Sequence, residues 1–214
     1  MDKSLTTVSS MPPIGANTMT GRNNFNVNNQ DGGVVNFNYN YYGNDTTDNT
    51  EKMIVVQSFS KEYYQLIVTL DDGIFKNNVV NVSKNRALLP GKVPPEIYAQ
   101  CSSLRNEGKE ILKTIPAIVC MENTEKNGVT NLNQWAIYCY IKLIKDVGRD
   151  IKIAFCPLAP IPQHKMCDEK SAIYFDLNMD CAITDLNTSE WTVHKVNLFE
   201  AFKVAGIDNV PVPR

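Results

Sequence analysis

The sequence predicts an α+β fold, with a mainly antiparallel, barrel-like sheet and two or three helices behind a disordered head and a β-hairpin. Segments with the period-two alternation of strands are interrupted by segments with the three- and four-residue spacing of helices. Their order is not the regular strand–helix alternation that builds a parallel sheet. At 214 residues the chain holds one ordinary core, assigned to residues 51–214, and an N-terminal extension.

The extension divides into two parts. Residues 1–21 are small and polar and include Pro12-Pro13, so we expect them to be disordered. Residues 22–50 form an asparagine-rich hairpin and a polar linker from Gly43 to Thr50, with Gln30-Asp31-Gly32-Gly33 at the turn. Asparagines alternate with the apolar residues of the hairpin, which we expect to form its interaction face: Phe25, Val27, Val35, Phe37, Tyr39 and Tyr41.

Such a hairpin is marginal alone, because two strands have an apolar face with nothing to cover it. Cover comes either from the core or from copies of the hairpin in other subunits. Rows of asparagine hydrogen-bond to one another when identical strands stack, which favours the second arrangement. We therefore expect a homo-oligomer assembled through this head.

The first half of the core contains a strand, its partner and a helix. The β-branched and aromatic run Lys61 to Leu70 predicts a strand, and Asn78 to Ser83 is its expected partner. Pro94-Pro95 opens one amphipathic helix that ends before Pro116.

The second half begins and ends with shorter elements around a hairpin. We expect a buried strand at 117–121, a hairpin of 135–147 with 151–155, a helix from Pro162 to about Phe175, a last strand at 190–196 and a closing helix at 198–204. Gly206 is well placed to cap the closing helix.

Composition excludes several classes of protein. With 21 basic and 23 acidic residues the net charge is −2, which disfavours nucleic-acid binding driven by bulk charge. No run of 18 apolar residues is present, and Met1 to Thr20 lack the apolar stretch of a secretory signal, so we expect no membrane association and a cytoplasmic location. The six cysteines contain no C-x-x-C pair and are expected to be reduced and mostly buried.

Two sets of residues are candidates for catalysis. His164 and Cys167 are three apart on the predicted helix after Pro162, which allows a Cys–His relation on one helical face; the alternative is a packed cysteine beneath a solvated histidine. Glu122, at the end of a predicted strand, forms with Asp176 or Asp185 a carboxylate set for a divalent ion or a general acid. The alternative is that these carboxylates are solvated or cap a helix.

No cofactor or metal is expected. Cys156, His164, Cys167 and Cys181 are chemically suited to zinc, but their spacings match no familiar finger or ribbon. Neither G-x-G-x-x-G nor G-x-x-x-x-G-K-[ST] occurs, so the usual glycine-rich phosphate loops are missing.

The segment from Arg22 to Tyr42, RNNFNVNNQDGGVVNFNYNYY, resembles the asparagine-rich heads that precede effector or sensor domains in bacterial antiphage and conflict-system proteins. Val34 to Tyr42 also looks like a segment of the small internal capsid protein of picornaviruses, although this chain lacks the myristoylation glycine. The expected function is a non-enzymatic binding or adaptor protein with a protein partner in a bacterial defence system. The alternatives are a metal-dependent hydrolase or nuclease, and a structural viral protein.

Overall fold

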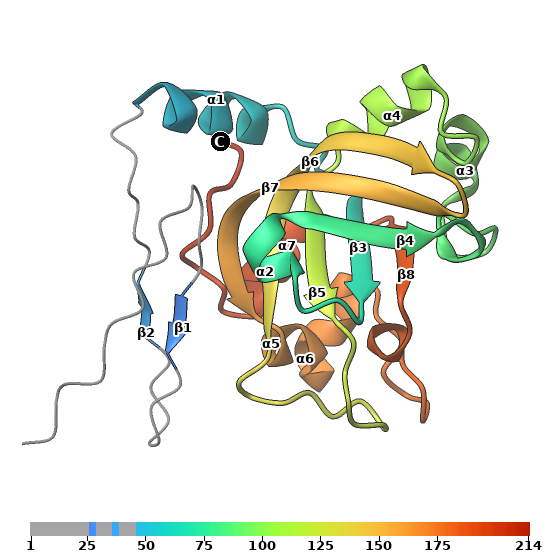
Figure 1. Cartoon of the computed structure of the whole chain (residues 1–214). Helices are drawn as coiled ribbons and strands as arrows, with labels where there is room; N and C mark the ends of the chain where they lie inside the picture. Colours follow the sequence, from blue (N-terminus) through green and yellow to red (C-terminus); the bar gives the residue numbers. More distant parts are fainter. Residues whose placement is uncertain (1–25, 29–35, 39–45) are drawn as a thin grey trace, which may run out of the picture.

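The computed structural model describes residues 26–28, 36–38 and 46–214, and its main body is a sheet flanked by helices (Figure 1). The sheet has six strands in the order β4-β7-β6-β5-β3-β8. Their bounds are β3 Tyr64–Thr69, β4 Val79–Ser83, β5 Ala117–Met121, β6 Trp135–Val147, β7 Asp150–Pro162 and β8 Glu190–His194. The predicted α+β class is confirmed.

The sheet is mixed rather than purely antiparallel. β3 and β5 run parallel, with Gln65 opposite Ala117 and Thr69 opposite Met121. The other neighbouring pairs of this sheet are antiparallel. The parallel pair arises because the chain between β3 and β5 passes through β4 and three helices, and such a crossover returns a strand in the same direction.

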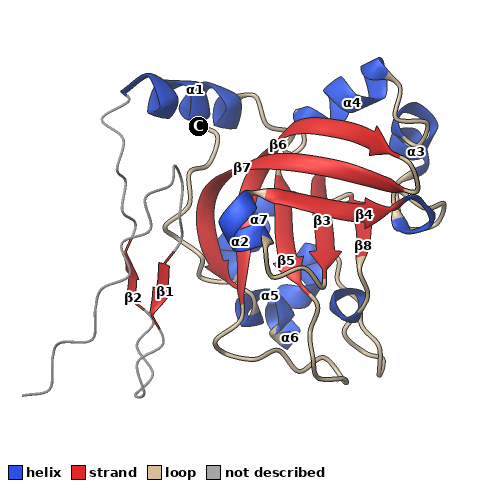
Figure 2. Ribbon diagram, in the orientation of Figure 1, coloured by secondary structure: helices blue, strands red, loops and turns tan. Residues whose placement is uncertain are grey.

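The expected hairpin in the second half of the core is confirmed as β6 and β7. Its turn contains Gly148 with φ +64°, a conformation that suits glycine. The ladder shifts register at two places, between Tyr138 and Cys139 and between Ile141 and Leu143. Such bulges bend a strand, and both long strands curve across the body in Figure 2.

The curled sheet forms half a barrel with a hydrophobic cluster on each face. Ile67, Ile153 and Trp191 belong to the cluster that also receives residues of helices α3 and α4. Tyr64 and Tyr138 belong to the second cluster, which packs against the C-terminal helices. β3 and β8 are buried along their whole length because they lie between these two layers.

The helices are α1 Thr46–Gln57, α2 Ile74–Asn77, α3 Pro95–Cys101, α4 Asn106–Lys113, α5 His164–Cys167, α6 Glu169–Ala172 and α7 Leu198–Val204. Short 3₁₀ turns lie at Lys84–Arg86, Ile173–Phe175 and Asp185–Asn187. The closing helix was predicted correctly, and the side chain of Asn197 caps its start.

Four sequence expectations about the elements need correction. The helix expected from Pro162 to about Phe175 is interrupted: Pro162 ends β7, and α5, α6 and a 3₁₀ turn follow it. The single helix expected after Pro94 is two helices, broken near Leu104, which has φ +49°. The expected polar linker is helical from Thr46 onward, so α1 crosses the boundary drawn at residue 50. β4 was expected to pair with β3 but pairs with β7, with Asn81 opposite Lys152. Sequence proximity favoured β3, whereas the crossover to β5 takes β4 to the far side of the sheet.

The head contributes a separate two-stranded antiparallel sheet of β1 Asn26–Asn28 and β2 Asn36–Asn38. Val27 is opposite Phe37, and asparagines are opposite one another on either side of this pair. The rest of the expected hairpin, including Phe25, Val35, Tyr39 and Tyr41, lies outside the described residues, as do residues 1–21.

Candidate functional site

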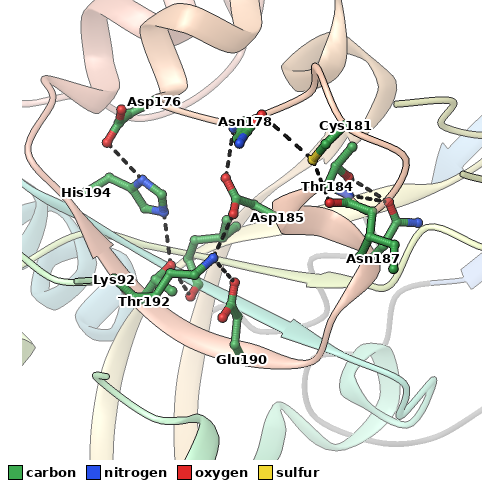
Figure 3. Close-up of polar contacts among 12 residues, drawn as sticks. Lys92, Asp176, Asn178, Cys181, Thr184, Asp185, Asn187, Glu190, Thr192 and His194 are labelled. Atoms are coloured by element: carbon green, nitrogen blue, oxygen red, sulfur yellow. Dashed lines mark hydrogen bonds and ion pairs between the residues drawn. The ribbon is translucent and has the colours of Figure 1, made fainter. Parts of the chain in front are cut away.

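A group of interacting polar side chains lies along one face of β8. We call it the β8 cluster, and it consists of Lys92, Asp176, Asp185, Glu190, Thr192 and His194 (Figure 3). β8 supplies three of these residues because alternate positions of a strand face the same side, here the side of Tyr64 and Leu66 on β3. The others come from the loops before α3 and before β8.

One half of the cluster is a chain of hydrogen bonds from a carboxylate through a histidine to a hydroxyl. His194 Nδ1 is 3.3 Å from Asp176 Oδ2, and His194 Nε2 is 2.9 Å from Thr192 Oγ1. The Tyr64 ring stacks on His194 with 5.0 Å between centroids. The hydrogen bond from His194 lowers the pKa of Asp176, although partial burial opposes this effect.

The same half is closed to solvent at its hydroxyl end. Thr192 is 3% exposed, and its Oγ1 donates a long hydrogen bond of 3.4 Å to the carbonyl of Leu66. A hydroxyl that acts as a nucleophile must meet the substrate carbonyl or phosphate. The carboxylate–histidine–hydroxyl order is that of a hydrolytic triad, but Thr192 lies inside the protein.

The other half of the cluster is built around the ammonium group of Lys92. Lys92 Nζ is 2.9 Å from Asp185 Oδ1 and 3.2 Å from Glu190 Oε1. Partial burial lowers the pKa of Lys92, but the hydrogen bonds and charges of Asp185 and Glu190 outweigh it, so the net pKa is raised. The lysine therefore stays charged and occupies the position that a bridging cation would take between the two carboxylates.

Hydrogen bonds also fix the loop that carries Asp185. Asp185 Oδ2 accepts from the backbone N–H of Asn178 at 2.8 Å. Thr184 and Asn187 form a capping box, and Asn187 Nδ2 donates to the carbonyls of Asn123 and Glu125 at 3.0 and 2.8 Å. The loop before β8 is thereby joined to the loop after β5.

The candidate carboxylates do not form one set. Asp176 and Asp185 both belong to the β8 cluster, where they bind different partners. Glu122 directly follows β5, its backbone N–H donates to Thr69 O, and its carboxylate accepts a short hydrogen bond from Ser189 Oγ. Each of the three carboxylates is thus engaged in joining loops or strands of the core.

His164 and Cys167 both lie in α5, but among the described residues their side chains are not hydrogen-bonded to each other. Cys167 Sγ donates to the carbonyl of Gln163 at 3.4 Å, and burial raises the pKa of its thiol to about 11. His164 Nδ1 is buried without a hydrogen-bond partner among the described residues, and burial lowers the pKa of His164. A thiol with a raised pKa is a poor nucleophile near neutral pH.

No group of three or more His, Cys, Asp or Glu side chains in the described parts of the chain is arranged to hold a metal ion. The zinc set considered above, Cys156, His164, Cys167 and Cys181, is therefore not assembled. Of these cysteines, Cys156 is buried and Cys181 is exposed, where it donates to the carbonyl of Ile183.

Sequence reasoning singled out Asp176 and Asp185 but missed Lys92, Glu190, Thr192 and His194. A signal for three of the four was present, since the run EWTVH places Glu190, Thr192 and His194 on one face of the expected strand. Lys92 gave no such signal, because its partners lie more than ninety residues away in the sequence.

Comparison of the chain with protein-family models, with curated proteins and with solved structures finds no match. Within the described residues, the helices are too short or too polar to cross a membrane. Function is therefore inferred from the chain's own geometry.

Proposed function

We propose that this chain is a non-enzymatic binding or adaptor protein that self-associates through its asparagine-rich head, residues 22–42. The pairing of β1 with β2 carries the proposal. Its register sets Val27 opposite Phe37 and sets asparagine opposite asparagine at Asn26 and Asn38. The resemblance of the head to those of antiphage proteins suggests bacterial defence as its setting.

This register pairs apolar residues with apolar residues and asparagines with asparagines. Residues opposite one another in an antiparallel ladder share a face of the ribbon, so an apolar pair alternates with asparagine pairs. A two-stranded ribbon gains little stability alone, whereas stacked copies add backbone hydrogen bonds, amide ladders and apolar contacts. Association of several heads supplies the cover that one head lacks.

The geometry of the core favours binding over catalysis. In the β8 cluster the hydroxyl of Thr192 is buried, and Lys92 forms ion pairs with both Asp185 and Glu190. Burial raises the pKa of Cys167 rather than activating its thiol. These groups hold loops and strands together, which is the role of a stable scaffold that presents a surface to a partner.

Deletion of residues 1–45 tests the assembly role. The cut precedes α1, which we retain because its Val56 is buried in the core. We expect the truncated chain to melt cooperatively while its mass, measured by light scattering, falls to that of a smaller assembly or a monomer. An unchanged mass with an intact core would refute assembly through the head.

A charge-substituted full chain gives a matched test. Val27→Asp with Phe37→Asp places two carboxylates opposite one another in the ribbon, where like charges repel. Met11→Asp with Ile14→Asp adds the same charge outside the ribbon. We expect only the first variant to lose mass, and equal effects of both would point to net charge instead of the ribbon.

A further inference from the structure

The two edge strands of the six-stranded sheet, β8 and β4, differ in whether their outer backbone groups are paired. The edge of β8 is covered, because Ala87 forms a bridge with Trp191 and Leu88 N–H donates to Trp191 O at 2.8 Å. On its outer edge β4 forms no ladder within the described residues: β7 is its one hydrogen-bonded neighbour, although β3 and β8 also come close to it across the curled sheet. An edge strand without cover presents free backbone donors and acceptors.

The free groups on β4 can be assigned from its ladder with β7. Asn78 O accepts from Phe155 N–H, and Lys84 N–H donates to Arg149 O, each at 3.0 Å. Even-numbered residues therefore bond to β7, and alternation directs the N–H and C=O of Val79, Asn81 and Ser83 to the open side. The side chains of Asn81 and Ser83 are exposed, as expected for an open edge.

Beside this edge the outer face of the sheet is basic. The register sets Asn81, Lys152 and Lys145 in one row across β4, β7 and β6, and all three side chains are exposed. No ion pair within the described residues involves Lys145, Lys152 or Arg149, the last in the turn between β6 and β7. Lys84 is paired with Asp146, and Asp150 of β7 lies opposite Ser83, so the basic residues of this row and of the β6–β7 turn without an ion pair among the described residues are Lys145, Arg149 and Lys152.

Apolar side chains accompany the lysines on the same face. Leu143 is 53% exposed and Val147 is 49% exposed, and both lie in β6 on either side of Lys145. A partner that fits this corner therefore carries negative charge together with apolar side chains, and it offers an extended backbone to β4.

We propose that the outer edge of β4, with the Lys145–Lys152 row beside it, binds an extended acidic segment of a partner protein by strand addition. The backbone of the segment pairs with Val79, Asn81 and Ser83, while its carboxylates lie on the face of the sheet that carries Lys152 and, one strand farther in, Lys145. The proposed function includes binding of a partner, and this proposal locates that binding on the core. It rests on the binding role and is independent of assembly through the head.

An acidic peptide fits this corner better than a single-stranded nucleic acid does. Both are polyanions, but single-strand binding uses exposed aromatic rings on which bases stack. Tyr140 of β6 is 7% exposed, with Lys142 Nζ 6.0 Å from its centroid, and Phe75 in the helix before β4 packs against the core cluster. Among the described residues, the face therefore offers charge and a strand edge but no exposed aromatic ring on which bases could stack.

The test measures binding of fluorescent peptides to the full-length chain by anisotropy. One probe alternates valine with glutamate, a second alternates valine with lysine, and a third is oligothymidine. We expect only the first to bind. Lys145→Ser with Lys152→Ser should weaken its binding by about tenfold or more, since each removes a charge that faces the peptide. Lys170→Ser with Lys203→Ser, which neutralises two exposed lysines in α6 and α7, is the matched control and should bind as the wild type does.

Backbone pairing is tested separately. Asn81→Pro removes an outward N–H while leaving the bonds to β7 in place, so it should weaken peptide binding without lowering the melting temperature greatly. Should that variant fail to fold, slowed amide exchange at Val79, Asn81 and Ser83 of the wild type on peptide addition gives the same information. The proposal is overturned by equal affinity in the two lysine variants, by preference for the oligonucleotide, by no binding of the Val/Glu peptide, or by unchanged exchange at these amides. Assembly mass is read independently, so failure here leaves the head unaffected.

Discussion

Replacing Gln65 by leucine tests how β8 is held against the rest of the core. Gln65 is fully buried in β3, and its Nε2 donates to the carbonyls of Leu112 and Ile115 at 2.8 Å each. Its Oε1 accepts from Trp191 Nε1 at 3.2 Å. One amide thus joins the end of α4 to the strand that carries the β8 cluster.

The cost of Gln65→Leu follows from the groups left without partners. The Leu112 carbonyl keeps a backbone bond from Ile115 N–H, whereas the Ile115 carbonyl and the Trp191 N–H lose the partners they have among the described residues. Each orphaned buried group costs about 1–3 kcal/mol, so we expect a loss of about 2–5 kcal/mol. For a chain of this size that lowers the melting temperature by about 5–15 °C.

Chemical denaturation and thermal unfolding followed by circular dichroism measure this loss. Trp191→Phe removes the indole N–H, so Gln65→Leu should cost about 1–2 kcal/mol less in that background than in the wild type. A loss below about 1 kcal/mol in the wild type, or an equal loss in both backgrounds, would mean that the amide does not carry the connection.

Two further substitutions test packing and charge. A Cβ at Gly108 would lie 2.5 Å from Gln100 O and 3.0 Å from Cys101 Cα, so Gly108→Ala should destabilise the chain by about 1–3 kcal/mol in urea unfolding although alanine favours helices; a neutral or stabilising result would contradict the close helix contact. His194 lowers the pKa of Asp176 in the folded state, so that carboxylate stabilises the fold above its unfolded pKa and loses this contribution as the pH falls through its folded pKa. Asp176→Asn should therefore show a shallower fall of melting temperature below about pH 4, and an unchanged slope would remove His194 as the cause.

The sequence predicted correctly the elements whose formation depends on short-range residue patterns. The β6–β7 hairpin follows from alternation on both sides of Gly148, and α7 follows from its apolar spacing and Gly206. α1 was missed because Val56 is its one fully buried apolar residue, so its sequence gives little helical periodicity. The break between α3 and α4 was missed because the apolar spacing continues across it.

The sequence could not predict which distant segments pair with one another, for a different reason. β3 is the strand that precedes β4 in the sequence, and the alternation of β4 would suit pairing with β3 or with β7. Nothing local in the sequence therefore shows that β7 is the partner. The β8 cluster shows the same limit, because Lys92 meets Asp185 and Glu190 across more than ninety residues. Strand faces can be read from a sequence, but the partner that completes a face cannot.

Polar residues at the β8 cluster and at the β4 edge differ in whether they already have partners within the core. Charged groups beside β8 bind one another: Lys92 is shared by two carboxylates, and His194 lies between Asp176 and Thr192. These groups already bind one another, although one lysine shared by two carboxylates leaves a net negative charge. Lys145 and Lys152 lie in a row without carboxylate partners among the described residues, next to backbone groups that the sheet leaves unpaired. This difference is why we place the proposed binding site at the β4 edge and not at the β8 cluster.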